Sequence, residues 1–222
     1  MNRAVLRLGS AIRIATGLCL AAAAPLAMAA SLEINLKDQS GAALNDAVVT
    51  ITRVNGQRLP VTPKNAEVDQ VNEMFVPHVR AIAVGSSINF PNSDHTQHHV
   101  FSFSEAKPFD LPLYKEKPSS PVTFDKAGIV TLGCNIHDHM LGYIVVTDSP
   151  LFTEVSNGKA VIANVPAGQL AIEIWHPRLV GEKAVQKQLT VTAEQNAVLT
   201  DTLELRPERM VRRPAKRGNS RY

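Results

Sequence analysis

The sequence lacks amphipathic helical periodicity, familiar catalytic motifs and any long apolar segment beyond its first 29 residues. Short alternating or apolar runs separated by Gly, Pro, Asn and Asp occur instead, and this pattern indicates an all-β protein. There is no H-E-x-x-H zinc motif, Ser-His-Asp order, paired carboxylate motif or phosphate-binding glycine loop, so we expect no enzyme activity. No later segment is apolar enough to cross a membrane.

The first 29 residues have the composition of a secretory signal peptide. Three arginines precede an apolar stretch at 14–26, and Ala27-Met28-Ala29 supplies the small-x-small pattern at which a signal peptidase cuts. The apolar stretch is shorter than the roughly 20 residues that a membrane span needs. We therefore predict export to the periplasm and removal of residues 1–29.

Cysteine is scarce, because the chain has only Cys19 and Cys134, and Cys19 lies inside the predicted signal peptide. Exported proteins usually pair their cysteines, whereas Cys134 would have no partner within the processed chain. A lone thiol is a buried apolar residue, a liability, or a reactive or metal-bound group. Its surroundings must decide between these alternatives.

Basic charge is concentrated at the two ends of the chain. The formal net charge of +3 equals the contribution of the three arginines in the predicted signal peptide. The segment 206–222 carries seven basic residues against Glu208, so the body between the ends is acidic. We predict a disordered basic tail at 206–222 and no nucleic-acid partner.

The length of the processed chain favours two β-sandwiches of about 100 residues each over a single one. The candidate strands are 32–36, 47–53, 81–84, 87–90, 99–103, 121–124, 128–134, 141–146, 158–164, 169–175, 188–191 and 197–205.

The two outer parts of the chain have the motifs of one sandwich. A strand, an Asp/Gly turn and a small-apolar strand occupy 31–53, and Pro166-Ala167-Gly168 precedes another strand downstream. This order resembles the carboxypeptidase regulatory-like, or transthyretin-like, sandwich. The resemblance implies one β-sandwich formed by 30–62 and 151–205, with 63–150 inserted as a second domain. Two independent sandwiches with an irregular boundary are the alternative.

Six of the seven histidines lie between His78 and His139, together with Cys134, which indicates a metal site. Cys134, His137 and Met140 follow one another as C-x-x-H-x-x-M in a predicted loop between two strands. His98, near the start of another predicted strand, is the best candidate for a further ligand. A thiolate, two imidazoles and a thioether suit both Cu(I) and Cu(II).

These residues resemble the cupredoxin family, and the C-x-x-H-x-x-M loop has the spacing of amicyanin-like proteins. The segment 84–92 resembles the strand and turn that precede the first ligand in plastocyanin-like proteins. The segment 75–79 and the Cys-x-Ile-His-x-x-Met-Leu-Gly-Tyr run resemble plastocyanin-like methylamine utilisation proteins. The resemblance implies a Greek-key β-sandwich that binds one copper ion through His98, Cys134 and His137, with Met140 as the axial ligand.

Several alternatives remain at this predicted site. Many cupredoxins have Asn directly after the first ligand, where this chain has His99, so His99 could replace His98; strand alternation lets only one of the two face inward. His139 is a second substitute ligand. Met140 could instead be a core methionine, and zinc also binds Cys with His.

The predicted function is single-electron transport between periplasmic redox proteins, such as a dehydrogenase and a c-type cytochrome. The alternative is copper capture or delivery, in which His95, His99 and His139 would supply additional ligands.

Overall fold

A computed structural model describes residues 30–116, 118, 120–181, 183–193 and 195–208, which form strands β1 to β17 and no helix. The all-β prediction is confirmed. The predicted signal peptide and residues 209–222 of the predicted tail lie outside the described residues. Within the described part of the chain, no helix has the length and apolarity needed to cross a membrane.

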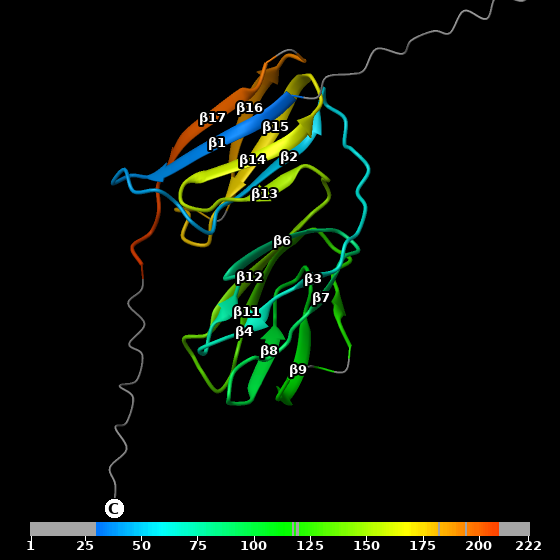
Figure 1. Ribbon diagram of the computed structural model, residues 1–222, viewed down its shortest axis with the longest axis vertical. Coiled ribbons are helices and arrows are strands. Elements are labelled where there is room, and N and C mark those ends of the chain that lie inside the picture. The colour runs from blue at the N-terminus through cyan, green and yellow to red at the C-terminus, as the bar shows by residue number, and fades with distance from the viewer. Residues whose placement is uncertain (1–29, 117, 119, 182, 194, 209–222) are drawn as a thin grey trace, which may run out of the picture.

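The strands form two β-sandwiches stacked end to end (Figure 1). In the upper sandwich, one sheet has the order β14-β1-β17 and the other the order β13-β2-β15-β16. Their bounds are β1 Ala30–Asp38, β2 Val48–Val54, β13 Phe152–Glu154, β14 Lys159–Val165, β15 Gly168–Trp175, β16 Val185–Val191 and β17 Ala197–Leu203. β1 pairs antiparallel with β14 and parallel with β17, so the beginning and end of the described chain share one sheet.

The lower sandwich is built from the chain between β2 and β13. Its larger sheet has the order β6-β12-β11-β8-β9, and it faces the smaller sheet β10-β7-β3 and the hairpin β4-β5. The bounds are β3 Ala66–Glu67, β4 Asp69–Gln70, β5 Phe75–Val76, β6 Val79–Ala83, β7 Ser87–Asn89, β8 His98–Ser102, β9 Phe109–Tyr114, β10 Val122–Thr123, β11 Gly128–Gly133 and β12 Leu141–Thr147.

Each sandwich has its own apolar core, produced by the two-residue period of its strands. In the upper sandwich, alternate residues of β1 and β15 are fully buried, namely Leu32, Ile34, Leu36, Leu170, Ile172 and Ile174. In the lower sandwich, Phe75, Phe90 and Phe124 fill the space between the sheets and have at most 2% of their surface exposed. Each such side chain contributes about 1.5–3 kcal/mol by its burial.

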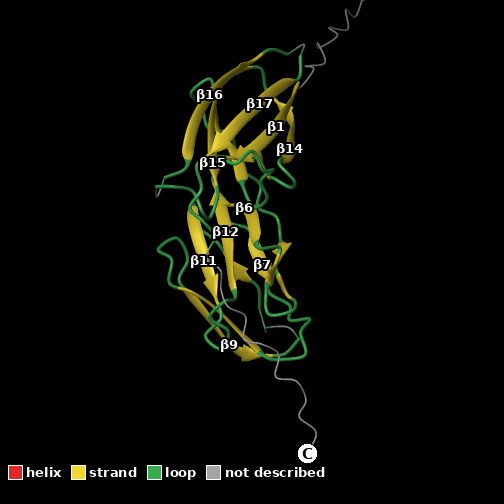
Figure 2. Cartoon of the chain, turned by 90° about the vertical axis from the view of Figure 1, so that its left-hand side faces the viewer, coloured by secondary structure: helices red, strands yellow, loops and turns green. Residues whose placement is uncertain are grey.

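A third, smaller apolar cluster joins the two sandwiches. It contains Val48, Val79, Ala81 and Val145, and Trp175 and Tyr143 pack against it with ring centroids 5.6 Å apart. Figure 2 shows the strands of the lower sandwich reaching the base of the upper one at this level.

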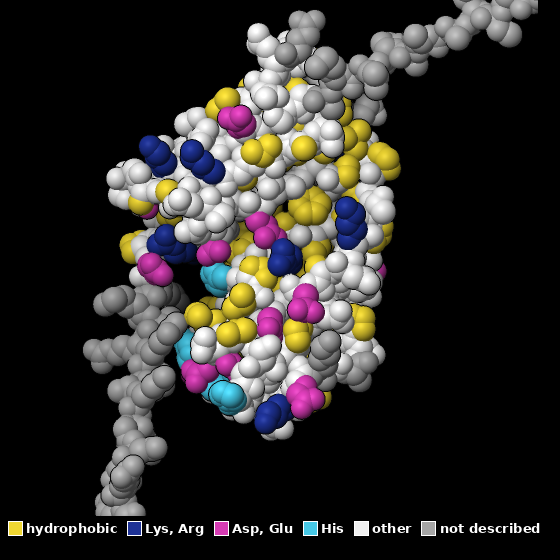
Figure 3. All heavy atoms as spheres, viewed as in Figure 1, with side chains coloured by type: hydrophobic (Ala, Val, Ile, Leu, Met, Phe, Trp, Pro, Cys, Tyr) yellow, Lys and Arg dark blue, Asp and Glu magenta, His cyan; other side chains and the backbone are white. Residues whose placement is uncertain are grey.

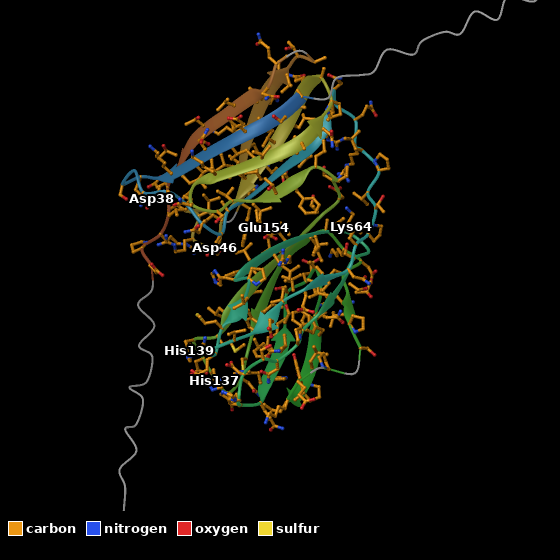
Figure 4. All side chains as sticks on the ribbon, viewed as in Figure 1. Asp38, Asp46, Lys64, His137, His139 and Glu154 are labelled. Atoms are coloured by element: carbon orange, nitrogen blue, oxygen red, sulfur yellow. The ribbon has the colours of Figure 1, made fainter. Side chains whose placement is uncertain are left out.

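Polar contacts reinforce this junction. Glu154 Oε1 accepts the backbone N–H of Ala81 at 2.7 Å, and Arg80 lies 3.3 Å from the same carboxylate. On another side of the junction, Asp46 lies 2.8 Å from His78. Figure 4 labels Glu154 and Asp46 between the two sandwiches. The junction is therefore held by both apolar packing and specific hydrogen bonds.

The strand β9 is absent from the strands expected from the sequence. Its residues Phe109–Tyr114 include Pro112, which cannot donate a ladder hydrogen bond. β9 is an edge strand that pairs only with β8 among the described strands, and an edge tolerates proline. The short hairpin β4-β5 was missed as well, because two-residue strands carry no periodic signal.

Candidate metal centre

The candidate ligands lie at the end of the lower sandwich that faces away from the upper one. Figure 4 labels His137 and His139 at this end, and Figure 3 shows histidine and acidic side chains gathered there. Both residues belong to the loop 134–140, which connects β11 to β12.

The hairpin β11-β12 fixes the ends of this loop. Gly133 is paired with Leu141, so the seven residues between them must turn within one strand spacing. The backbone N–H of Met140 donates to the carbonyl of His137 at 2.8 Å and closes the turn. On the other side, Gly133 is paired with Phe101, which brings the start of β8 beside the loop. His98 is the first residue of β8 and therefore lies close to Cys134.

Three ligand atoms meet in this region. Cys134 Sγ is 3.9 Å from His98 Nδ1 and 3.8 Å from His137 Nδ1, and all three atoms lie within 4.8 Å of one another. A metal held at about 2.3 Å from sulfur and 2.0–2.1 Å from nitrogen separates those atoms by about 3.6–3.8 Å. The two sulfur–nitrogen separations are therefore close to those that a single bound ion requires.

The three candidate ligands differ in exposure. The side chain of His98 is 0% exposed and Cys134 is 4% exposed, whereas the His137 side chain is 20% exposed. Cys134 has no disulfide partner among the described residues. The site thus has a buried base of one cysteine sulfur and one imidazole, and a single imidazole edge that reaches solvent.

Met140 is 1% exposed and packs in the same apolar cluster as Cys134. This position is compatible with a core methionine and with an axial thioether, so its role as a ligand stays a prediction.

The alternative histidines have other partners. His99 points to the opposite face of β8, where its Nε2 lies 2.8 Å from Asp110 and its ring packs on Phe101 at a centroid distance of 5.2 Å. His139 Nε2 lies 3.2 Å from a carboxylate oxygen of Glu73. Neither residue belongs to the three-atom cluster found among the described residues.

The remaining histidines lie elsewhere. His95 is exposed on the loop before β8. His78 contacts Asp46 at the junction between the sandwiches. His176 is 5% exposed in the upper sandwich, and burial lowers its pKa to about 4, so it is neutral at physiological pH.

Two acidic residues that were not among the candidates from the sequence complete the surroundings. Asp94 Oδ2 lies 2.7 Å from His98 Nε2, on the side of the ring away from Cys134. Glu73 lies 3.9 Å from His137 Nε2 as well as close to His139. The spacing of Asp94 four residues before His98 is a weak signal. Glu73 is far from the candidate ligands in the sequence, so no sequence signal pointed to it.

A partly buried tyrosine supports the base of the site. The Tyr114 hydroxyl donates to the carbonyl of Phe90 at 2.6 Å and accepts from Gln70 Nε2. Burial raises the pKa of Tyr114 to about 12, so the hydroxyl stays protonated. Because Tyr114 is paired with His98 across β8 and β9, this network anchors the strand that carries the buried ligand.

Comparison with known proteins gives matches among solved structures alone. No family model matches the chain, and no curated protein does. A purple cupredoxin from Nitrosopumilus maritimus is 20% identical over 37% of this chain and 99% of its own, with a TM-score of 0.34. An oxidised amicyanin variant is 21% identical over 36% of this chain and 80% of its own, with a TM-score of 0.34.

The copper-containing nitrite reductase from Thermus scotoductus SA-01 is 27% identical over 44% of this chain, with a TM-score of 0.35. This chain spans 25% of the reductase. The all-β fold thus has cupredoxins among its structural neighbours. Since each alignment covers less than half of the chain, the assignment of the site depends on its own donor atoms.

Proposed function

We propose that this protein is an exported type 1 copper protein that carries single electrons between redox partners in the periplasm. The observation that supports this most strongly is the convergence of one thiolate and two imidazole Nδ1 atoms within 4.8 Å. Copper bound there would supply a one-electron couple, because soft sulfur and imidazole ligands suit both of its oxidation states.

The protein's contribution is to hold the ligands in one arrangement. His98 lies in β8, and Cys134 directly follows β11, so two paired strands determine their separation. Both side chains are buried, which excludes water from the base of the site. A rigid ligand set changes little between oxidation states, and this favours fast electron transfer. Met140, buried in the same cluster as Cys134, would supply a thioether as a further ligand.

The imidazole of His137 is the proposed electron exit. It is the one candidate ligand of the three with an appreciably exposed side chain. Ile136, 46% exposed, and Leu141, 43% exposed, lie in and beside the same loop and provide apolar surface. A redox partner such as a dehydrogenase or a c-type cytochrome would approach this end. The upper sandwich would have a supporting or docking role, and we assign it no chemistry.

Two alternatives are less well supported. Zinc accepts Cys and His ligands, but structural zinc sites usually have four firm ligands, and the cluster here has three with a methionine nearby. The additional histidines are the sequence feature that supports the alternative of copper delivery. His99 and His139 instead lie next to Asp110 and Glu73.

The test is a visible absorption and electron paramagnetic resonance (EPR) spectrum of Cu(II)-loaded protein without residues 1–29, compared with Cys134→Ser. We expect an intense blue or green thiolate-to-copper band with narrow copper hyperfine splitting in the parent and none in the variant. A reversible Cu(II)/Cu(I) couple should accompany it. A pale spectrum that Cys134→Ser leaves unchanged would refute electron transport and favour copper handling or a structural role.

A further inference from the structure

Asp94 makes three short contacts at the base of the candidate metal centre. Its Oδ2 lies 2.7 Å from His98 Nε2 and accepts the backbone N–H of Glu73 at 2.8 Å. Its Oδ1 accepts the backbone N–H of Asn72 at 2.6 Å. The Asp94 side chain is only 14% exposed, so these contacts are largely shielded from water. Hydrogen bonds to an ionised acceptor are roughly twice as strong as neutral ones.

The contact with His98 determines which nitrogen faces the metal. His98 Nδ1 points at Cys134 Sγ, and Nε2 points at Asp94. With Nδ1 bound to a metal, the ring proton would lie on Nε2 and would be donated to the carboxylate. Because the ring is completely buried, it has no water to replace this acceptor.

The contacts with Asn72 and Glu73 tie a second part of the site to the same carboxylate. Both residues have positive φ, 53° and 59°, a backbone conformation that costs free energy without local support. Asp94 supplies that support through the two N–H groups. The turn then holds the Glu73 carboxylate near His137 Nε2 and His139 Nε2. Each of the two candidate imidazole ligands therefore has a carboxylate near its outer nitrogen.

We propose that Asp94 is a positioning residue of the copper centre that fixes His98 Nδ1 toward the ion and lowers the reduction potential. This inference rests on the proposed function. A carboxylate that accepts the Nε2 proton makes the imidazole a stronger electron donor. Stronger donation and the nearby negative charge stabilise Cu(II) more than Cu(I). Asp94 thus biases the centre toward donating its electron.

The test compares Asp94→Asn with Asp138→Asn in otherwise unchanged protein. Asn is isosteric with Asp and removes the charge and one acceptor. Asp138 is an exposed carboxylate next to His137, so its replacement removes the same charge near the site. Loss of an outer partner of a metal-bound histidine typically changes metal affinity about 10–100-fold.

We expect Asp94→Asn to shift the Cu(I)/Cu(II) equilibrium toward Cu(I) by at least about tenfold, which is about 59 mV for one electron. Asp138→Asn should shift it by less than about threefold, because solvent screens an exposed charge. Equal shifts in the two variants, or no shift in Asp94→Asn, would overturn the inference.

A measurement on the unmutated protein covers the case in which Asp94→Asn does not fold. In the Cu(I) form, ¹⁵N nuclear magnetic resonance (NMR) should show His98 with its proton on Nε2 and slow exchange of that proton with water. A proton on Nδ1, or rapid exchange, would refute the positioning role. If the unmutated protein shows no thiolate-to-copper band, the proposed function itself fails. A coloured protein in which Asp94→Asn changes nothing refutes this inference alone.

Discussion

Replacement of Gly142 by alanine should destabilise the lower sandwich measurably. Gly142 lies in β12, two residues after Met140, opposite Leu132 of β11. A Cβ atom added there would lie 2.9 Å from Cβ and 3.0 Å from Cδ2 of Phe75. Phe75 is 2% exposed in the core, so its ring has no free space into which to move.

The magnitude follows from two opposing effects. Overpacking a well-filled core typically costs about 1–3 kcal/mol. Replacing Gly by Ala also restricts the unfolded chain and returns about 0.4–1 kcal/mol. We therefore expect Gly142→Ala to lower the free energy of unfolding by about 1–2 kcal/mol. Urea denaturation of the metal-free protein, followed by circular dichroism, measures this difference.

Gly133→Ala is the matched control. A Cβ at Gly133 would lie equally close, 2.9 Å, to Cζ of Phe101. Phe101 is only partly buried and contacts the exposed Phe103, so its ring can swing outward. Gly133→Ala should change the free energy of unfolding by less than about 0.5 kcal/mol, as is usual where the surroundings yield.

A double substitution tests the stated cause. Phe75→Ala removes Cγ and Cδ2, two of the three atoms that the Cβ added by Gly142→Ala would meet, so the two changes together should cost less than the sum of the single changes. Residues in contact show coupling of about 0.5–3 kcal/mol. Additive effects, or equal costs at Gly142 and Gly133, would refute the packing argument.

Three further predictions concern pH, the junction and the metal. Burial lowers the pKa of His176 from 6.5 to about 4, so folding disfavours its protonated form. The contribution of His176 to stability should therefore be complete above about pH 6.5 and fall progressively toward pH 4. In a pH series of thermal melts, His176→Gln should flatten the curve over this range. Glu154→Ala removes the acceptor for the Ala81 N–H and should cost about 1–3 kcal/mol in chemical denaturation, whereas a cost below 0.5 kcal/mol would mean that water replaces the carboxylate. Copper at about 1,000 times its dissociation constant should stabilise the parent by about 4 kcal/mol, and Cys134→Ser should lose most of that increment in calorimetry with and without a chelator.

Much of the fold was predictable because strand periodicity is local. Alternation of apolar and polar residues predicted most of the longer strands, including those that became β1, β2, β12, β15 and β17. The strands that escaped prediction are the edge strand β9, whose proline obscures its pattern, and the two- or three-residue strands β3, β4, β5 and β13. In these, pairing with a neighbour rather than local sequence determines the conformation.

The candidate site likewise contains residues that the local sequence places together and residues that only the fold brings together. Cys134 and His137 belong to one short loop, so their spacing in the sequence already limits their separation in space. The two acidic residues beside the imidazoles depend on other parts of the fold. Asp94 and Glu73 meet because the β4-β5 turn folds against the loop before β8, and nothing in their spacing required this.

The sequence by itself determined the all-β class and the grouping of soft ligands, because both depend on neighbours within a few residues. Only the tertiary structure decided which histidine joins Cys134. His98 and His99 are adjacent, and the face that β8 turns toward the core directs His98 to the thiolate and His99 to Asp110. Likewise, only the fold showed that β17 pairs with β1 across the whole length of the described chain. Contacts between residues so distant in sequence are chosen by the packing of complete sheets, which no local pattern encodes.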